Sequence, residues 1–444
     1  MRSYLILGMS LLFLIQYFVG EQWLQYVVVV FALLAFLGSI TKADPFPRII
    51  GLLMMTFGFV IELSKGTGMK GISEGIFLIL PLLCLLTLVP LLSIPLKLGG
   101  HFESISILLR KFLNQPKKLY AGITGILFVL GPILNLGSVR IIHDFLEELK
   151  LPSAMSARSY VVGFSTAMLW SPYFASVTLV LHYQNVAYSD YFFYGIGLSI
   201  LSLILGNVLF AFWAKKNTLN VEVTESSIPF TNNHRRNLYK LILFVILLIS
   251  ACLAIEKVTQ WSMVVIVCLL SIMVPLLMGA FAQDWKELLP PLIDFKDHTV
   301  PLMNNEIMLF MSAGMLAYAL KGTSIMNGVS SFLTVLSRQS FILFAIAIVL
   351  IVFCITFIGI HQIAAIGVLA MQLDPSELGI SNLALALTLL LTWTTTTALS
   401  PFSGLNLMVS RFSSISGNKL GLRINGPHLL AVVFIGIALI AFIK

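Results

Sequence analysis

Long apolar segments alternate with short polar connections along almost the whole chain. An α-helix that crosses the hydrocarbon core of a bilayer needs about 20 predominantly apolar residues. The segments predicted to span a membrane on this ground are 4–19, 23–40, 49–62, 75–97, 157–184, 188–214, 239–255, 259–281, 303–320, 381–411 and 427–443. The pattern therefore predicts an all-α polytopic membrane protein with about eleven transmembrane helices.

Two further apolar segments, 119–149 and 340–372, are too long for one crossing and too short for two. Small or polar residues interrupt each segment near its middle, at 131–138 in the first and at 356–362 in the second. A chain that enters a membrane and returns to the same side, with its turn buried in protein, has this pattern. Both segments are predicted to form re-entrant hairpins.

The polar stretch 215–238 divides the chain into halves of nearly equal length, and the halves share a motif. Residues 165–175 read STAMLWSPYFA and residues 394–404 read TTTTALSPFSG, so small and hydroxyl residues precede Ser-Pro-aromatic in both. Each copy follows a hairpin, and each hairpin follows a Leu-Lys pair punctuated by glycine, at 96–99 and 320–322. Because an odd number of crossings separates the matching points, the halves are predicted to form an inverted repeat.

This repeat predicts how the chain is divided. Residues 1–74 are predicted to form N-terminal scaffold helices, and residues 215–238 a cytoplasmic linker. The first repeat (75–214) contains a scaffold helix, the hairpin 119–149 and a broken helix, 157–184. The second repeat (239–444) contains scaffold helices, the hairpin 340–372 and a broken helix, 381–411.

Composition supports the membrane assignment and excludes other classes of protein. Hydrophobic residues make up 58% of the 444 residues, charged residues make up only 10%, and the mean hydropathy is +0.98. A soluble domain carries about 25% charged residues. A soluble enzyme, a secreted disulfide scaffold and a disordered regulator are therefore excluded.

The net charge of +8 is scattered through short connections, and we interpret it as a topology signal. No basic domain is present, so no nucleic-acid partner is expected. With the N-terminus in the cytoplasm, the inner side receives Lys42, Arg48, Arg110, Lys111, Lys117, Lys118, Lys150, Arg158, Lys215, Lys216, Arg235, Arg236, Arg411, Lys419 and Arg423. The outer loop 63–74 is a mild exception. We expect a multi-pass protein of the cell (plasma) membrane.

The sequence carries no motif of an enzyme or a metal centre. The four cysteines lie in apolar stretches without CxxC spacing. The chain has no Walker loop, no HExxH and no GxSxG. We therefore expect no catalytic residues, no metal centre and no cofactor. A bound sodium ion is the one inorganic ligand that we consider.

Pro172 and Pro401 are predicted to interrupt the helices that carry them, because proline lacks an amide hydrogen and clashes with the preceding turn. In lipid, the freed backbone groups need surrounding protein or a water-filled cavity. Two such breaks at related positions predict a cavity near the bilayer midplane. The alternative is a pair of proline kinks whose neighbouring hydroxyls bond back to their own helices.

The first hairpin tip carries Asn135 and Ser138, and Arg140 follows at once. An arginine at the centre of a bilayer costs roughly 3 kcal/mol or more, so its placement needs a reason. We weigh three: Arg140 binds an anion, it pairs with Asp144 one helical turn on, or it lies in the cytoplasm because the hairpin is shallow.

The second tip carries His361 and Gln362, the only strongly polar side chains in an apolar stretch of about thirty residues. His361 is interpreted as a proton-coupling group, a solute donor or a buried imidazole bonded to a carbonyl. Among the acids, Glu306 begins a span and either caps it or takes part in coupling. Glu62 and Glu74 flank an outer loop and are expected to be solvated.

The candidate ligands fall into two overlapping sets. The solute-binding set is Asn135, Ser138, Arg140, Ser171, Pro172, His361, Gln362, Thr396, Thr397, Ser400, Pro401 and Asn406. The ion-coupling set is Asn135, Thr166, Ser171, Thr395 and Ser400.

In this order, the features resemble the ion transporter superfamily, and within it the divalent-anion/sodium symporters and their citrate, arsenite and sodium/proton antiporter relatives. The resemblance covers the chain from about residue 75 onward. In that family each repeat has an interfacial helix, a re-entrant hairpin, a broken helix and a closing span. Sodium symporters of the family carry Ser-Asn-Thr at the tips, where this chain has LNLGS from Leu134 and IGIHQ from Ile358. The resemblance implies a dimer-forming scaffold domain and a transport domain that moves like an elevator.

These observations lead to one principal hypothesis. The protein is expected to be a secondary active transporter of an anionic small solute, such as an organic acid, coupled to Na⁺ or H⁺. Its expected partners are the solute, the coupling ion, membrane lipid and a second copy of the chain. The alternative is a translocase for a phosphate-bearing lipid carrier; a cation/proton antiporter and a membrane-embedded enzyme are less favoured.

Overall fold

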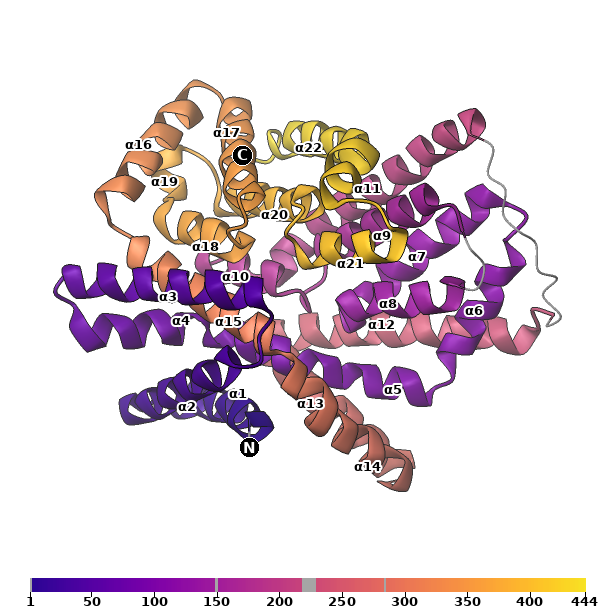
Figure 1. The fold of residues 1–444 in the computed structure, drawn as a ribbon, viewed down its shortest axis with the longest axis horizontal. Helices are drawn as coiled ribbons and strands as arrows, with labels where there is room; N and C mark the ends of the chain where they lie inside the picture. The colour runs from indigo at the N-terminus through magenta and orange to yellow at the C-terminus, as the bar shows by residue number, and fades with distance from the viewer. Residues whose placement is uncertain (1, 148–150, 218–228, 283–284) are drawn as a thin grey trace.

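In the computed structural model, which describes residues 2–147, 151–217, 229–282 and 285–444, the chain is helical, and these ranges contain no β-strand. Ten helical stretches within them are long and apolar enough to cross a membrane. The predicted all-α polytopic architecture is confirmed. Figure 1 shows α1 and α2 at the lower left and α16, α17 and α22 along the top of the view.

The first half of the chain contains eleven α-helices and one short 3₁₀ helix in its described part. They are α1 (Arg2–Val19), α2 (Gln22–Ile40), α3 (Pro45–Ser64), α4 (Gly68–Leu88), η1 (Val89–Leu92), α5 (Ser93–Leu98), α6 (His101–Lys111), α7 (Pro116–Leu134), α8 (Leu136–Leu146), α9 (Ser153–Met168), α10 (Ala175–Tyr183) and α11 (Tyr188–Lys216).

The second half repeats much of this order. Its described elements are α12 (Asn232–Thr259), α13 (Met263–Ala282), α14 (Trp285–Asp294), η3 (Phe295–Thr299), η4 (Val300–Leu302), α15 (Asn304–Leu320), α16 (Ser324–Gln339), α17 (Phe341–Phe357), α18 (Gln362–Gln372), α19 (Pro375–Leu378), α20 (Asn382–Leu399), α21 (Gly404–Ser413), η5 (Lys419–Asn425) and α22 (Gly426–Ile440). The middle of the expected linker, 218–228, lies outside the described residues.

Two pairs of consecutive helices occupy the predicted hairpin segments, α7 with α8 and α17 with α18, and the members of each pair contact each other. The predicted interruptions are also present, because α9 stops at Met168 before α10, and α20 stops at Leu399 before α21. The count of long helices therefore differs from the expected eleven. The segment 157–184 forms two short helices, and α15 has 17 residues, whereas α7 is long enough to cross.

The two halves pack against each other through their broken helices. The broken helix of the first half consists of α9 and α10, and both of these contact α20. In addition, α9 contacts α21 and α10 contacts α18. On the other side of the molecule, α15 packs along α3, where glycines allow close approach. A Cβ at Gly51 or at Gly58 would lie only 3.0 Å from the nearest atom of Met308 or Met315 on α15. The domain boundaries and the orientation across a membrane stay predictions.

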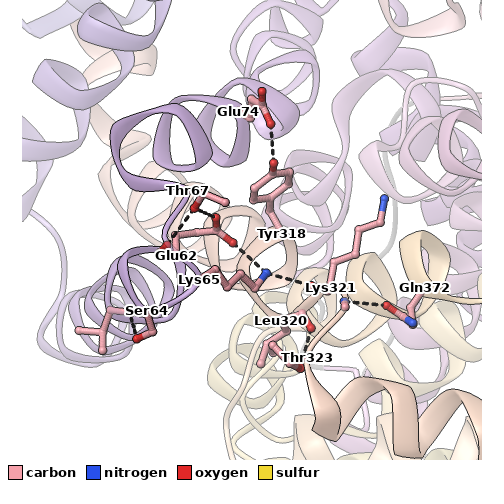
Figure 2. A network of polar contacts seen from close by, with 12 residues as sticks. Glu62, Ser64, Lys65, Thr67, Glu74, Tyr318, Leu320, Lys321, Thr323 and Gln372 are labelled. Atoms are coloured by element: carbon pink, nitrogen blue, oxygen red, sulfur yellow. Dashed lines mark hydrogen bonds and ion pairs between the residues drawn. The ribbon is translucent and has the colours of Figure 1, made fainter.

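Two acids that were expected in solvent instead bind other side chains, Glu62 as a buried residue and Glu74 as a half-buried one (Figure 2). Glu62 is only 1% exposed; its Oε1 lies 2.9 Å from Lys65 Nζ and its Oε2 accepts a 2.5 Å hydrogen bond from Thr67 Oγ1. Glu74 Oε2 accepts a 2.6 Å bond from the hydroxyl of Tyr318 on α15. Burial of a carboxylate is tolerated here because each one is paired or hydrogen-bonded.

Candidate functional site

The break between α20 and α21 is held open by side-chain hydrogen bonds. Asn406 Nδ2 donates to the carbonyls of Ala398 and Ser400, at 3.1 and 2.7 Å, and so takes the place of helical amides. Ser400 Oγ donates to the carbonyl of Thr356 at 2.8 Å, which joins this break to the end of α17. Asn406 Oδ1 is buried and has no hydrogen-bond partner among the described residues. An unsatisfied buried acceptor of this kind costs about 1–3 kcal/mol.

Both hairpin tips reach this second break. A Cβ on Gly404, the first residue of α21, would lie 3.2 Å from Leu136 at the first tip. A Cβ on Gly359 at the second tip would lie 3.1 Å from Phe46 and 3.9 Å from Phe402. The rings of Phe46 and Phe402 are stacked with centroids 5.4 Å apart. The structure thus places both hairpin tips, which carry members of the predicted solute-binding set, beside the second break, and α3 joins them through Phe46.

At the first tip the polar side chains shape the turn. Asn135 has a φ of 50°, which few non-glycine residues other than Asn and Asp adopt. Its Oδ1 accepts from the amide of Leu136 at 2.9 Å, and its carbonyl accepts from Ser138 Oγ at 2.7 Å. The Asn135 side chain therefore caps the start of α8, and the Ser138 hydroxyl bonds back to the turn that precedes the helix.

At the second tip, His361 is also a capping residue. Its Nδ1 accepts from the amide of Ile363 at 3.3 Å, and its ring lies 5.1 Å from that of Phe310 on α15. This bond differs from the one to a carbonyl that the third interpretation of His361 proposed, because the imidazole faces the amides at the start of α18. Gln362 is buried at the first position of α18.

The first break, between α9 and α10, is closed by side chains of α11. The hydroxyl of Tyr188 donates to the carbonyl of Trp170 at 2.8 Å, and the hydroxyl of Tyr191 donates to the carbonyl of Leu169. Ser171 Oγ accepts from the amide of Tyr173 at 3.2 Å. The carbonyls of Leu169 and Trp170, which have no helical partner at this break, are thus satisfied within the protein.

The threonines near the breaks mostly bond to their own helices, as the alternative interpretation proposed. The hydroxyls of Thr166, Thr395, Thr396 and Thr397 donate to carbonyls three or four residues earlier, at 2.8, 2.7, 2.8 and 2.8 Å. Thr394 Oγ1 is buried and has no partner among the described residues. The two breaks are therefore similar in sequence, but different side chains bond their backbone carbonyls: tyrosines of α11 at the first break and Asn406 at the second.

A cavity of about 750 Å³ lies beside this region, between α8, the start of α9 and α21. Its volume suits a small organic solute, since ligand pockets commonly enclose about 300–1,000 Å³. The lining residues are Asp44, Arg140, His143, Asp144, Leu146, Glu147, Leu151, Ser153, Ser156, Tyr160, Leu407, Met408, Arg411, Phe412 and Ser413. Arg140 is the member of the predicted solute-binding set that lines the cavity.

The charged side chains of the cavity come from distant parts of the chain. Arg140 is on α8 in the first half, and Arg411 is on α21 in the second. Among the residues that the structure describes, no ion pair joins Arg140 to Asp144. Asp144 and Glu147 follow Arg140 by one and two helical turns, so they lie farther from the hairpin tip.

An aromatic group borders the same cavity. The imidazole of His143 stacks on the ring of Phe412 with centroids 3.9 Å apart, and its Nδ1 lies 3.4 Å from the hydroxyl of Tyr160. No local sequence pattern marks these residues as ligands, because they become neighbours only when α8, α9 and α21 pack together. Arg411 was noted only as a topology signal.

Two other features bear on bound ions. No group of three or more His, Cys, Asp or Glu side chains in the described part of the chain is placed to hold a metal ion. Glu306, in the first turn of α15, has a buried Oε2 without a hydrogen-bond partner in that part of the chain. Its interpretation as a cap or as a coupling group stays open.

Comparison with known proteins identifies a fold and no family. No family model matches the chain, and no curated protein matches it. A solved structure, that of the YdaH transporter of Alcanivorax borkumensis, is similar with a TM-score of 0.60 over 90% of this chain and 99% of that chain. The sequence identity is 15%, so the similarity shows a shared fold.

Proposed function

We propose that this protein is a secondary active transporter of an anionic small solute, built as in the ion transporter superfamily and resident in the cell membrane with its N-terminus in the cytoplasm. The observation that carries the proposal is the 750 Å³ cavity, where Arg140 and Arg411 come from opposite halves of the chain. The fold that the chain shares with a transporter supports it.

The charges suggest how a solute would sit. A guanidinium binds a carboxylate or phosphate through two parallel hydrogen bonds, which is why arginine serves where planar anions are recognised. Arg140 is nearer the hairpin tip than Asp144 and Glu147, so an anionic group would enter the inner part of the cavity. The carboxylates, with Ser156 and Tyr160, would face hydroxyl or amino groups on the rest of the solute.

Transport also requires movement of the protein and a source of energy. The hairpins and broken helices would form a transport domain that moves past a dimer-forming scaffold, exposing the cavity to each side in turn. A gradient of H⁺ or Na⁺ would supply the energy. A lipid-carrier translocase would need an apolar groove beside its cation, and the charged and hydroxyl-bearing lining favours a water-soluble solute.

The test begins with a screen for the solute. Purified protein would be heated with organic acids, phosphates and phospholipid headgroups, with and without sodium, to find compounds that raise the melting temperature. Uptake of the selected compound would then be measured in proteoliposomes. We expect Arg140→Ala and Arg411→Ala each to reduce initial uptake at least about tenfold, since a charge-assisted hydrogen bond contributes about 1.5–3 kcal/mol.

Arg338→Ala provides the matched control, because Arg338 is exposed in the last turn of α16 and does not line the cavity. It should transport at the wild-type rate. Normal uptake by Arg140→Ala protein at subsaturating solute would contradict the anion-binding role.

A further inference from the structure

Glu306 is an acid at the start of α15 whose carboxyl group lacks a partner for one of its oxygens. It is the third residue of the helix and is half-buried. Its Oε2 atom has no contact with solvent and no hydrogen-bond partner among the described residues. None of the ion pairs in that part of the chain includes Glu306. An ionised carboxylate is costly to bury without a partner, and a carboxyl group in such a place takes up a proton instead.

Two other buried acids show what Glu306 lacks. Glu62 pairs with the ammonium of Lys65 and accepts a hydrogen bond from Thr67. Glu256 accepts two backbone amides, at 2.8 and 2.9 Å. Positive charge and N–H donors stabilise the ionised form of a carboxyl group, so both of these acids can keep their charge inside the protein.

The polar side chains next to Glu306 are already engaged with other residues. Asn304 Oδ1 accepts a hydrogen bond from Arg2 Nη1 at 3.2 Å, and Asn305 Oδ1 accepts one from the amide of Asp44 at 2.8 Å. Hard cations bind through several oxygen atoms at once, whereas a proton needs one. The surroundings of Glu306 Oε2 therefore suit a proton better than a metal ion.

The other charged groups at this end of α15 come from the elements around it. Helix α15 packs against α2, α3, α4 and α18. Asp44 is close enough for its charge to act on Glu306. On α4 the charged residues are at the helix start, near the opposite end of α15, where Glu74 bonds to Tyr318. The charged or titratable residues near the start of α15 are Arg2 on α1, Lys42 and Asp44 between α2 and α3, Arg48 in the first turn of α3, and His361 before α18, whose ring contacts Phe310.

Asp44 links Glu306 to the cavity. Asn305, the residue before Glu306, accepts from the amide of Asp44 and donates from Nδ2 to Asp44 Oδ2 at 2.7 Å. Asp44 also lines the cavity that Arg140 and Arg411 share. An ionised Glu306 would add a second negative charge beside Asp44 and weaken the binding of an anion there, and protonation removes that charge. By linkage, a bound anion strengthens the binding of the proton by the same factor.

We propose that Glu306 is the proton-binding group of this transporter, and that its neutral form is the one that admits an anionic solute to the cavity. A proton from water bonds to Glu306 Oε2 before the solute binds, and it returns to water when the solute has left on the other side of the membrane. The inference rests on the proposed transport function and names the group that would couple it to a proton gradient.

Infrared difference spectroscopy of the purified protein tests whether this carboxyl group holds a proton. Without any solute and near neutral pH, the wild type should show the C=O stretching band of a protonated carboxylic acid. Glu306→Gln protein should lack this band. The matched control is Glu287→Gln, because Glu287 is the third residue of α14 and is exposed, and its spectrum should keep the band. A wild type without the band would overturn the proposal.

Uptake in proteoliposomes tests the coupling, and its probe is the compound that gives the largest rise in melting temperature in the screen above. A pH gradient, acidic outside, should drive accumulation of this compound by the wild type and by Glu287→Gln protein. Glu306→Gln protein should lose that accumulation, because glutamine has no proton to release. It should still exchange internal for external compound, because glutamine resembles the neutral acid that admits the anion.

The remaining outcomes are also decisive. Normal accumulation by Glu306→Gln protein would overturn the coupling role. Loss of both accumulation and exchange in Glu306→Gln protein with the wild-type melting temperature would overturn it too, because Glu306 would then be needed for more than the proton. Failure of the wild type to take up or exchange any compound would count against the transport function, and the infrared band would still show whether Glu306 holds a proton.

Discussion

At the scale of single residues, acidic side chains depart most from what the sequence indicated. Glu256 falls between the expected spans 239–255 and 259–281, yet it is only 8% exposed and accepts the amides of Tyr188 and Ser189 at 2.8 and 2.9 Å. It caps the N-terminus of α11, where a negative charge is favourable. Its partners lie 67 and 68 residues away, and no local pattern distinguishes such an acid from a solvated one.

Replacement of Glu62 tests whether a buried, hydrogen-bonded carboxylate stabilises this protein. Glu62→Ala removes the partner of Lys65 and Thr67 and leaves a cavity in the loop between α3 and α4. Because water can reach Lys65, we expect a modest loss of stability, about 1–2 kcal/mol. The melting temperature in detergent should fall.

Glu21→Ala is the control, since Glu21 is exposed and its side chain makes no cap bond to α2. It should melt at the wild-type temperature. Equal melting temperatures for the Glu62 and Glu21 variants would mean that the buried pair does not stabilise the loop.

At the scale of elements, the sequence predicted most of the helices because their apolar lengths are set by the membrane. Pro172 and Pro401 marked both breaks, and the small residues at 131–138 and 356–362 marked both hairpin turns. The expected span 75–97 lies within one continuous helical stretch, Gly68–Leu98, that is long and apolar enough to cross a membrane. Within it, Pro90 is the second residue of η1 and Pro95 lies in α5, and neither proline can donate an amide to the helical hydrogen-bond pattern.

The sequence did not predict how the ends of the broken helices pack against the rest of the protein. Gly421, in η5, lies against the end of α20, and a Cβ there would be 2.3 Å from the carbonyl oxygen of Leu399. Only glycine permits this approach of two backbones. We expect Gly421→Ala to displace the second break, to destabilise the protein by about 1–3 kcal/mol, and to reduce uptake of the solute.

The comparison variant is Gly197→Ala on α11, where a Cβ would meet nothing within 4 Å among the described atoms. Alanine favours a helix over glycine by about 1 kcal/mol, so this protein should be at least as stable as the wild type. Thermal melting and proteoliposome uptake would be measured on both. Wild-type behaviour of Gly421→Ala protein would show that the contact at Leu399 is not required.

At the scale of the whole molecule, the cavity was beyond sequence analysis because its lining comes from four separate segments. Asp44, the α8 residues, the start of α9 and the end of α21 are up to about 370 positions apart, and only the packing of α8 and α9 against α21 brings them together. The sequence identified Arg140 from its cost in a membrane. It could not identify Arg411, which follows a break and resembles any cytoplasmic arginine.

The same arrangement bears on the coupling ion. A sodium site in a broken helix uses free backbone carbonyls, but here those of Leu169 and Trp170 accept tyrosine hydroxyls, and those of Ala398 and Ser400 accept the amide of Asn406. The titratable side chains instead gather in the cavity, where Asp44, His143, Asp144 and Glu147 line the space beside the two arginines. Proton binding is therefore the coupling that the described residues favour.

We accordingly expect uptake in proteoliposomes to continue when sodium is replaced by potassium on both sides of the membrane. A protonophore should abolish accumulation of the solute, because it removes the gradient that proton coupling needs. The control is exchange of internal for external solute, which requires no net driving force and should survive the protonophore. Uptake that stops without sodium but withstands the protonophore would instead indicate sodium coupling. Asn406 Oδ1, which has no hydrogen-bond partner among the described residues, would then be the first sodium ligand to test.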